Sequence, residues 1–156
     1  MSPLILELSD KESMRIEAIL MDDDAEEALL FVKEVRSVAG PRSLTVGRPG
    51  RIRIRILNNG LTLWLARPNS SLPGQVRLGI SIVTATGRVT DLDFCRLELP
   101  HDVAPGSEVV VQGDIPAFHE PGVVHLRLDL VAEWITWFVE HGSAPYYYDL
   151  EIKSEL

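Results

Sequence analysis

The feature that most constrains the fold is a strict alternation of apolar and polar residues in the last third of the chain. From residue 124 to residue 130 every second residue is aliphatic, and the residues between them are His125, Arg127 and Asp129. A repeat of two residues is the pattern of a β-strand that buries one face. We therefore expect a central strand whose aliphatic side chains face a core and whose three polar side chains face away from it.

Shorter stretches with the same repeat follow one another from residue 43 onward. Residues 51–56 read Arg-Ile three times, which predicts an inward row of isoleucines and an outward row of arginines. Further strands are expected at 76–82, 94–99, 108–112 and 146–152. Turn residues such as Asn59-Gly60 separate these strands. About seven short strands with turns between them are typical of an antiparallel, immunoglobulin-like β-sandwich, so the predicted fold class is mostly β.

Residues 1–43 follow a helical pattern instead. Ser9 and Glu12 have the spacing of a capping box, which predicts a helix over residues 10–21. Apolar residues then recur at helical spacing over residues 25–39, and Gly40-Pro41 would end that helix. We therefore divide the chain into a helical appendage, residues 1–43, and a sandwich, residues 44–156. The apolar surface of the second helix is wide, so it could also form a homodimer contact.

The outward arginines at positions 51, 53 and 55 have three interpretations. They could form a solvated face, they could pair with the acidic appendage, or they could hold an acidic polysaccharide. The appendage has ten acidic and five basic residues, so its charge is complementary to the arginine row. Exposed ion pairs contribute only about 0–1 kcal/mol each, so any docking would depend on apolar contacts.

Charge and composition exclude several classes of partner. The net charge is −8 and the isoelectric point is near 4.9, whereas binding to nucleic acid or to anionic membranes requires a basic field. The longest apolar runs are far too short to span a membrane, and residues 1–8 do not resemble a signal peptide. Cys95 is the single cysteine, so no internal disulfide can form. We expect a reduced, cytoplasmic protein.

The sequence does not favour catalysis. His125 and Asp129 would lie about 13 Å apart along one strand, too far to share a proton or a metal ion. The other histidines, at positions 101, 119 and 141, fall in turns without the spacing of metal ligands. No serine occupies a nucleophile elbow, and Cys95 has the pattern of a buried, inert thiol. We therefore expect no enzyme activity, no cofactor and no metal site.

Aromatic residues near turns and strand ends are the better indication of function. Flat rings stack on the apolar faces of sugars, and neighbouring polar groups then bond the hydroxyls. The candidate ligand-binding residues are Trp134, Tyr146, Tyr147, Tyr148, Glu133, Arg127 and Asp129. We expect Trp64, Trp137 and Phe138 to be structural aromatics that close the ends of the core. The alternative is that all these rings are core residues, although three consecutive tyrosines in one strand cannot all face inward.

Three motifs in order resemble a known family. They are NNG followed by a tryptophan in residues 58–64, LPHDVAPG in residues 99–106, and LRLDLVAE followed by WF in residues 126–138. Together they resemble bacterial immunoglobulin-like modules similar to the carbohydrate-binding C-terminal domains of O-antigen ABC transporters. Related modules are appended to glycosyltransferases and methyltransferases of surface-polysaccharide biosynthesis. The resemblance covers residues 44–152. We expect the residues ahead of it to be a short helical segment in place of a transporter ATPase or transferase domain, and Trp134 stands where the family usually has glycine.

The resemblance implies a non-catalytic module that binds a polysaccharide in surface-glycan biosynthesis or export. Its partner would be a glycan or a glycan-processing protein. The alternative is a protein-interaction or assembly module that uses the N-terminal helix for dimerisation or for docking to a partner.

Overall fold

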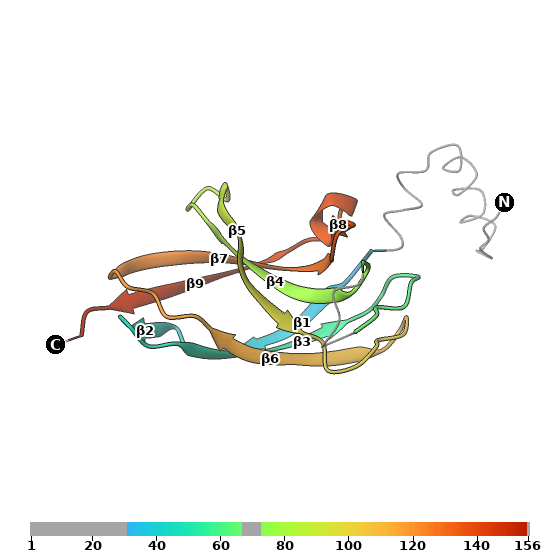
Figure 1. The fold of residues 1–156 in the computed structure, drawn as a ribbon, viewed down its shortest axis with the longest axis horizontal. Coiled ribbons are helices and arrows are strands. Elements are labelled where there is room, and N and C mark those ends of the chain that lie inside the picture. Colours follow the sequence, from blue (N-terminus) through green and yellow to red (C-terminus); the bar gives the residue numbers. More distant parts are fainter. Residues whose placement is uncertain (1–30, 67–72, 156) are drawn as a thin grey trace.

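The protein forms a sandwich of two β-sheets (Figure 1). The computed structural model describes residues 31–66 and 73–155. The smaller sheet has the order β1-β3-β6, with β1 at Glu34–Ala39, β3 at Gly50–Leu57 and β6 at Glu108–Ile115. The larger sheet has the order β2-β9-β7-β4-β5. Its strands are β2 (Ser43–Thr45), β9 (Tyr146–Lys153), β7 (Gly122–Ala132), β4 (Val76–Val83) and β5 (Val89–Glu98).

Two short elements follow the central strand β7. Strand β8 (Thr136–Trp137) turns back and pairs with the end of β7, and the 3₁₀ helix η1 (Phe138–His141) comes directly after it. Gly142 ends this helix with φ +87°, a left-handed conformation that favours glycine. The chain then enters the larger sheet as β9, between β2 and β7.

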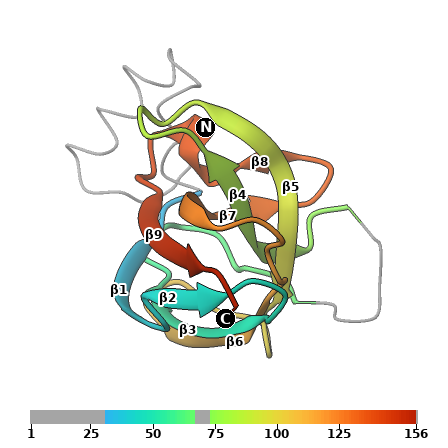
Figure 2. The ribbon, with the colours of Figure 1, turned by 90° about the vertical axis from the view of Figure 1, so that its left-hand side faces the viewer.

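The strand order identifies an immunoglobulin-like sandwich. Consecutive strands cross between the layers, from β3 to β4, from β5 to β6 and again from β6 to β7, as in a Greek key. All neighbouring strands are antiparallel except β2 and β9, which lie side by side in parallel at the edge seen in Figure 2. The predicted mostly β, immunoglobulin-like class is confirmed.

The alternating patterns in the sequence place the core correctly. The isoleucines at positions 52, 54 and 56 of β3 are 0% exposed, while the arginines between them are exposed. They face the leucines of β7 across the sandwich, and the whole forms one cluster of buried residues. Trp64 and Phe138 are also fully buried and meet edge to face, with ring centroids 5.7 Å apart. Both are core residues, as predicted.

The arginine row of β3 is a partly paired surface. Arg51 lies 3.2 Å from Asp114 of β6, and Arg55 lies 3.6 Å from Glu108 at the other end of the same strand. These carboxylates come from the neighbouring strand and not from the acidic appendage. The hypothesis that the arginine row pairs with the predicted helices of the appendage concerns mainly residues 1–30, which lie outside the described part of the chain.

The helix predicted over residues 25–39 is wrong for its last part. Glu34–Ala39 form strand β1, which pairs antiparallel with β3 and turns Val35 and Val38 toward the core. These β-branched residues fit a strand as well as a helix, and the unpaired edge of β3 decides between the two. The first two thirds of the expected appendage, residues 1–30, lie outside the described residues. Its helices and the division of the chain at residue 43 stay predictions.

A buried ion pair fastens the start of β1 to β7. Lys33 Nζ lies 2.7 Å from Asp129 Oδ1, and both side chains are 0% exposed. The ammonium also donates to the carbonyl of Ala144 at 2.9 Å, while the second carboxylate oxygen accepts from the backbone N–H of Val139 in η1 at 2.9 Å. Burial lowers the pKa of Lys33 below its usual value, and the carboxylate of Asp129 opposes that effect. The pair thus joins β1, β7, η1 and the approach to β9.

Removing one charge of this pair should destabilise the protein strongly. We expect Lys33→Met or Asp129→Asn to lower the free energy of unfolding by about 3–5 kcal/mol, because each leaves an uncompensated buried charge. The double variant should lose clearly less than the sum of the two. Urea unfolding of the four proteins measures this coupling. The matched control is Arg51→Met in the exposed Arg51–Asp114 pair, which should cost about 0–1 kcal/mol; equal losses in both pairs would contradict the assignment.

Candidate functional site

The face of the larger sheet that points away from the core holds most of the predicted site residues. Its central strand β7 presents His125, Arg127 and Asp129 on this face, as the alternation predicts. Strand β9 adds Tyr147 and Asp149, which lie directly opposite Arg127 and His125 in the register. Strands β4 and β5 complete the face, so it is built from four adjacent strands.

A tryptophan packs against this face because one residue beneath it has no side chain. A Cβ atom at Gly79 of β4 would lie only 2.5 Å from a ring carbon of Trp137. The guanidinium carbons of Arg96 and Arg127 lie 4.8 Å and 5.5 Å from the ring centroid, as in cation–π contacts. Trp137 was expected to close an end of the core, but it packs on the outside of the sheet and is only half-buried. Arg127 is committed to this contact, and its Nε has no hydrogen-bond acceptor.

Glu133 is the centre of an ionic network beside this tryptophan. Its Oε2 accepts from Nε of Arg77 at 3.0 Å and from Nε of Arg96 at 2.9 Å. Arg96 reaches further to Asp93 at 2.6 Å, and Arg77 to Glu98 at 3.1 Å. Glu133 was predicted to bind a ligand directly. Its shared oxygen is already occupied, so its clearest role is to position the two arginines and the turn that follows.

The turn between β7 and β8 carries the most exposed large hydrophobic side chain of the described residues. Trp134 is 81% exposed and has φ +69°, the only positive φ of a non-glycine residue in the described part of the chain. The N–H of Ile135 donates to the carbonyl of Ala132 at 2.9 Å, so Trp134 is the third residue of a four-residue turn. Positive φ at that position alone defines a type II turn, in which glycine is the usual residue.

Backbone hydrogen bonds hold this turn in place. Glu133 donates to the carbonyl of Gln75 and accepts from the N–H of Gly74, both at 2.8 Å. An αL conformation costs a bulky residue about 1–3 kcal/mol and persists only where the surroundings impose it. Backbone hydrogen bonds thus fix the turn that carries Trp134, while its ring lies in solvent. The ring is next to a shallow hollow of about 240 Å³ that Arg96, Thr136 and Glu140 also line.

Two predicted ligand residues are corrected by the structure. Tyr148 is buried in the core, and this burial raises the pKa of its phenol. Its hydroxyl donates to the carbonyl of Pro41 at 2.5 Å. Asp129 faces outward as expected, but Lys33 and η1 cover it completely. The alternation indicates which way a side chain points, whereas a residue that is distant in sequence decides whether solvent reaches it. Tyr146 and Tyr147 remain exposed, at 37% and 54%.

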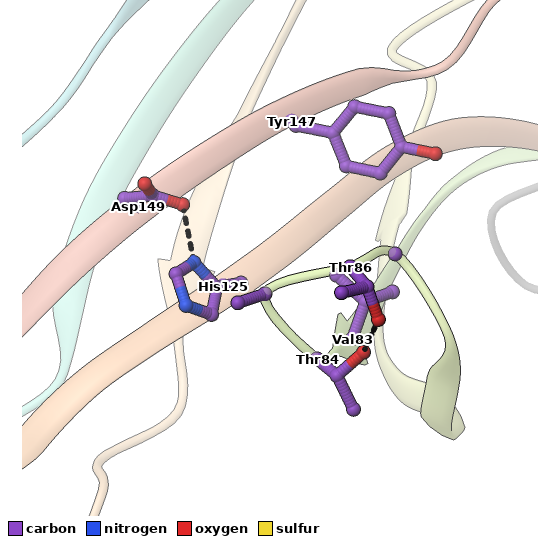
Figure 3. A pocket seen from close by; sticks show the side chains of 8 residues that line it. Val83, Thr84, Thr86, His125, Tyr147 and Asp149 are labelled. Atoms are coloured by element: carbon purple, nitrogen blue, oxygen red, sulfur yellow. Dashed lines mark hydrogen bonds and ion pairs between the residues drawn. The ribbon is translucent and has the colours of Figure 1, made fainter.

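A second, larger hollow lies at the opposite end of the same face (Figure 3). It has a volume of about 400 Å³ and lies between Tyr147 of β9 and the turn that joins β4 to β5. Nδ1 of His125 lies 2.8 Å from Oδ1 of Asp149 at its side. Sequence reasoning considered His125 only with Asp129. The alternation places His125 and Asp149 on one face, but the register that pairs them cannot be obtained from the sequence.

Other chemistry is sparse in the described part of the chain. It contains no group of three or more histidine, cysteine, aspartate or glutamate side chains that could hold a metal ion. Cys95 is half-buried, and burial raises the pKa of its thiol, which disfavours the reactive thiolate. Among these same residues, no helix has the length and apolar character needed to cross a membrane.

Comparison with known proteins shows likeness only to solved folds. No protein-family model matches the sequence, and no curated protein does. The C-terminal domain of wzt is 13% identical with a TM-score of 0.49, over 80% of this chain and 75% of that one. The CARDB domain of PF1109 from Pyrococcus furiosus, solved with di-metal ions, is 15% identical with a TM-score of 0.48, over 79% and 94%. A β-glucosidase from Listeria innocua in complex with glucose is 13% identical with a TM-score of 0.47, and the match covers 78% of this chain but only 16% of the enzyme.

A side chain at position 79 should disturb the packed tryptophan. We expect Gly79→Ala to lower the free energy of unfolding by about 1–3 kcal/mol, because the new methyl group overlaps the ring of Trp137 and the ring cannot move without leaving both arginines. Urea unfolding gives the loss, and tryptophan fluorescence reports the displaced ring. The control is Gly79→Ala in a Trp137→Ala background, where the new methyl group no longer meets the ring. A loss no larger than that of the control would contradict the packing described here.

Relieving the backbone at position 134 should stabilise the protein. We expect Trp134→Gly to raise the free energy of unfolding by about 1 kcal/mol, because relief of αL strain exceeds the greater chain entropy of glycine in the unfolded state. Trp134→Ala keeps the strained φ and should change stability little. Thermal unfolding of both variants tests this. If Trp134→Gly is the less stable of the two, the ring and not the backbone dominates at this position.

Proposed function

We propose that the protein is a non-catalytic carbohydrate-binding module that recognises a polysaccharide of surface-glycan biosynthesis or export, and that Trp134 is its principal contact. The observation that carries the proposal is an indole ring held in solvent on a strained but braced turn. A turn of this type usually has glycine at that position, so a tryptophan there costs stability and gives no burial in return. A ligand that covers the ring would account for its presence.

The surroundings of Trp134 suit a sugar. A pyranose ring needs a flat apolar surface for its C–H face and polar groups for its hydroxyls. The hydroxyl of Thr136, the carboxylate of Glu140 and the guanidinium of Arg96 line the hollow beside the ring. The salt bridges of Arg96 to Glu133 and Asp93 fix its position, so this part of the site is preorganised. The resemblance of the three sequence motifs to polysaccharide-binding modules points the same way.

The alternative is a protein-interaction or assembly module, and one observation favours it. Ile135 lies next to Trp134 and is 60% exposed, so one turn presents two large apolar side chains. Interfaces between proteins often bury such a pair as an anchor. A homodimer through the N-terminal helix, the other form of this hypothesis, concerns residues outside the described part of the chain.

One pair of variants separates the two functions. We expect Trp134→Ala to weaken binding of the full chain to a hit from a glycan array at least tenfold, because the stacking surface is lost. Ile135→Ala should change that affinity less than twofold, since a branched aliphatic chain offers no flat surface. Isothermal titration calorimetry measures both, with circular dichroism to verify folding. A protein anchor would instead lose affinity for its partner in both variants, and an array without any hit would overturn the glycan proposal.

A further inference from the structure

We infer that the hollow between Tyr147 and the β4–β5 turn is a second sugar subsite, which takes a neutral unit of a linear glycan that also contacts Trp134. This inference rests on the function proposed above. It adds a second position on the sheet, the charge of the sugar there and a minimum length of the ligand.

The hollow has a flat aromatic wall. The side chain of Tyr147 is 54% exposed and points away from the core, opposite to the neighbouring Tyr148. In Figure 3 its ring lies across the hollow from the turn that carries Thr84 and Thr86. The ring is therefore placed to cover one side of a ligand, and the turn lies on the other side.

The opposite wall is a rigid turn that offers hydroxyl groups. Gly87 donates to the carbonyl of Thr84 at 2.8 Å and has φ +94°, which suits a tight hairpin with glycine at its left-handed position. Oγ1 of Thr84 accepts from the N–H of Arg88 at 3.0 Å and lies 3.0 Å from Oγ1 of Thr86. These bonds fix the two hydroxyls before any ligand arrives.

The charge at this site indicates a neutral sugar. Only two of the eight lining residues, His125 and Asp149, can carry a charge, and they are bonded to each other. No lysine or arginine lines the hollow to hold a sugar carboxylate or phosphate. The carboxylate of Asp149 is 64% exposed and can accept hydroxyl hydrogen bonds with its free oxygen.

The two sites lie on one continuous surface. Tyr147 is opposite Arg127 in the register of β7 and β9, and the guanidinium of Arg127 lies against the ring of Trp137. Trp137 is in turn opposite Val131, and the turn with Trp134 comes between them. Val131 is four positions beyond Arg127 in β7, a distance of about 13 Å along the strand. One sugar ring cannot reach both aromatic contacts, whereas a chain of several units can.

Affinity should therefore depend on the length of the glycan. The probes are neutral linear gluco-, manno- and galacto-oligosaccharides of one to six units, titrated by calorimetry against the full chain. We expect the series that binds to gain at least tenfold in affinity between the shortest and the longest members. Tyr147→Ala should abolish that gain and leave the affinity for the shortest binding member unchanged. Tyr146→Ala is the matched control, because that tyrosine is on the opposite side of β9 and should keep the gain.

The outcomes distinguish this inference from the proposed function. If Trp134→Ala abolishes binding but Tyr147→Ala keeps the gain with length, the second subsite is wrong and the function stands. If a single sugar binds as tightly as six units, the subsite is also wrong. Absence of binding by every probe, or binding only of acidic glycans in a parallel array, overturns the inference. Asp149→Ala removes a hydrogen-bond acceptor of the hollow and leaves its aromatic wall intact. This variant, checked for unchanged thermal unfolding, should also reduce the gain in affinity with glycan length.

Discussion

The open face of the larger sheet depends on the buried pair of Lys33 and Asp129. The carboxylate holds two segments at once, because one oxygen contacts the ammonium and the other accepts the N–H of Val139. Through that second bond the start of η1 is fixed over the end of β7. Since β8 directly precedes η1, the position of Trp137 on the sheet follows from the same contact. Burying two charges is costly unless each has good partners, and here the ammonium also bonds the Ala144 carbonyl.

A series of contacts connects the position of Trp137 to the exposed turn at Trp134. Trp137 packs on Gly79 and lies against Arg96, Arg96 bonds Glu133, and Glu133 precedes Trp134 in the turn. Each step fixes the next, so the strained backbone at Trp134 can persist although the ring itself has few contacts. Strain that the surroundings impose is common where a side chain must be presented to a ligand. The rigid packing beneath the turn and the exposure of the Trp134 ring therefore depend on the same set of contacts.

The sequence predicted the fold better than the site, for a physical reason. Alternation in β3 and β7 follows from one buried face per strand, so Ile54 and Leu128 could be placed without knowing any partner strand. Strand β1 was mistaken for a helix because Val35 and Val38 are three residues apart, which is a helical spacing. In the strand, a register shift between Val35 and Ser37 brings both valines to the core side, and this shift depends on pairing with β3. The site depends still more on register. His125 faces Asp149, and Asp129 is covered by Lys33, through pairings between residues far apart in the chain. Trp134 was singled out as an aromatic residue near a turn, where the family pattern usually has glycine, and its positive φ is known only from the structure.

The spacing of aromatic side chains on this face also fits the energetics of glycan recognition. A single aromatic contact contributes little beyond its buried area, on the order of 0.5–1.5 kcal/mol for ring pairs. One exposed indole would therefore give weak binding and little selectivity. Two weak contacts on a rigid sheet act together when one polymer spans them, because binding at the first raises the effective concentration at the second. That gain requires the separation of the contacts to be fixed, and a strand such as β7, paired on both sides, fixes it. A sandwich of this kind can thus select a polymer by length and geometry without a deep pocket.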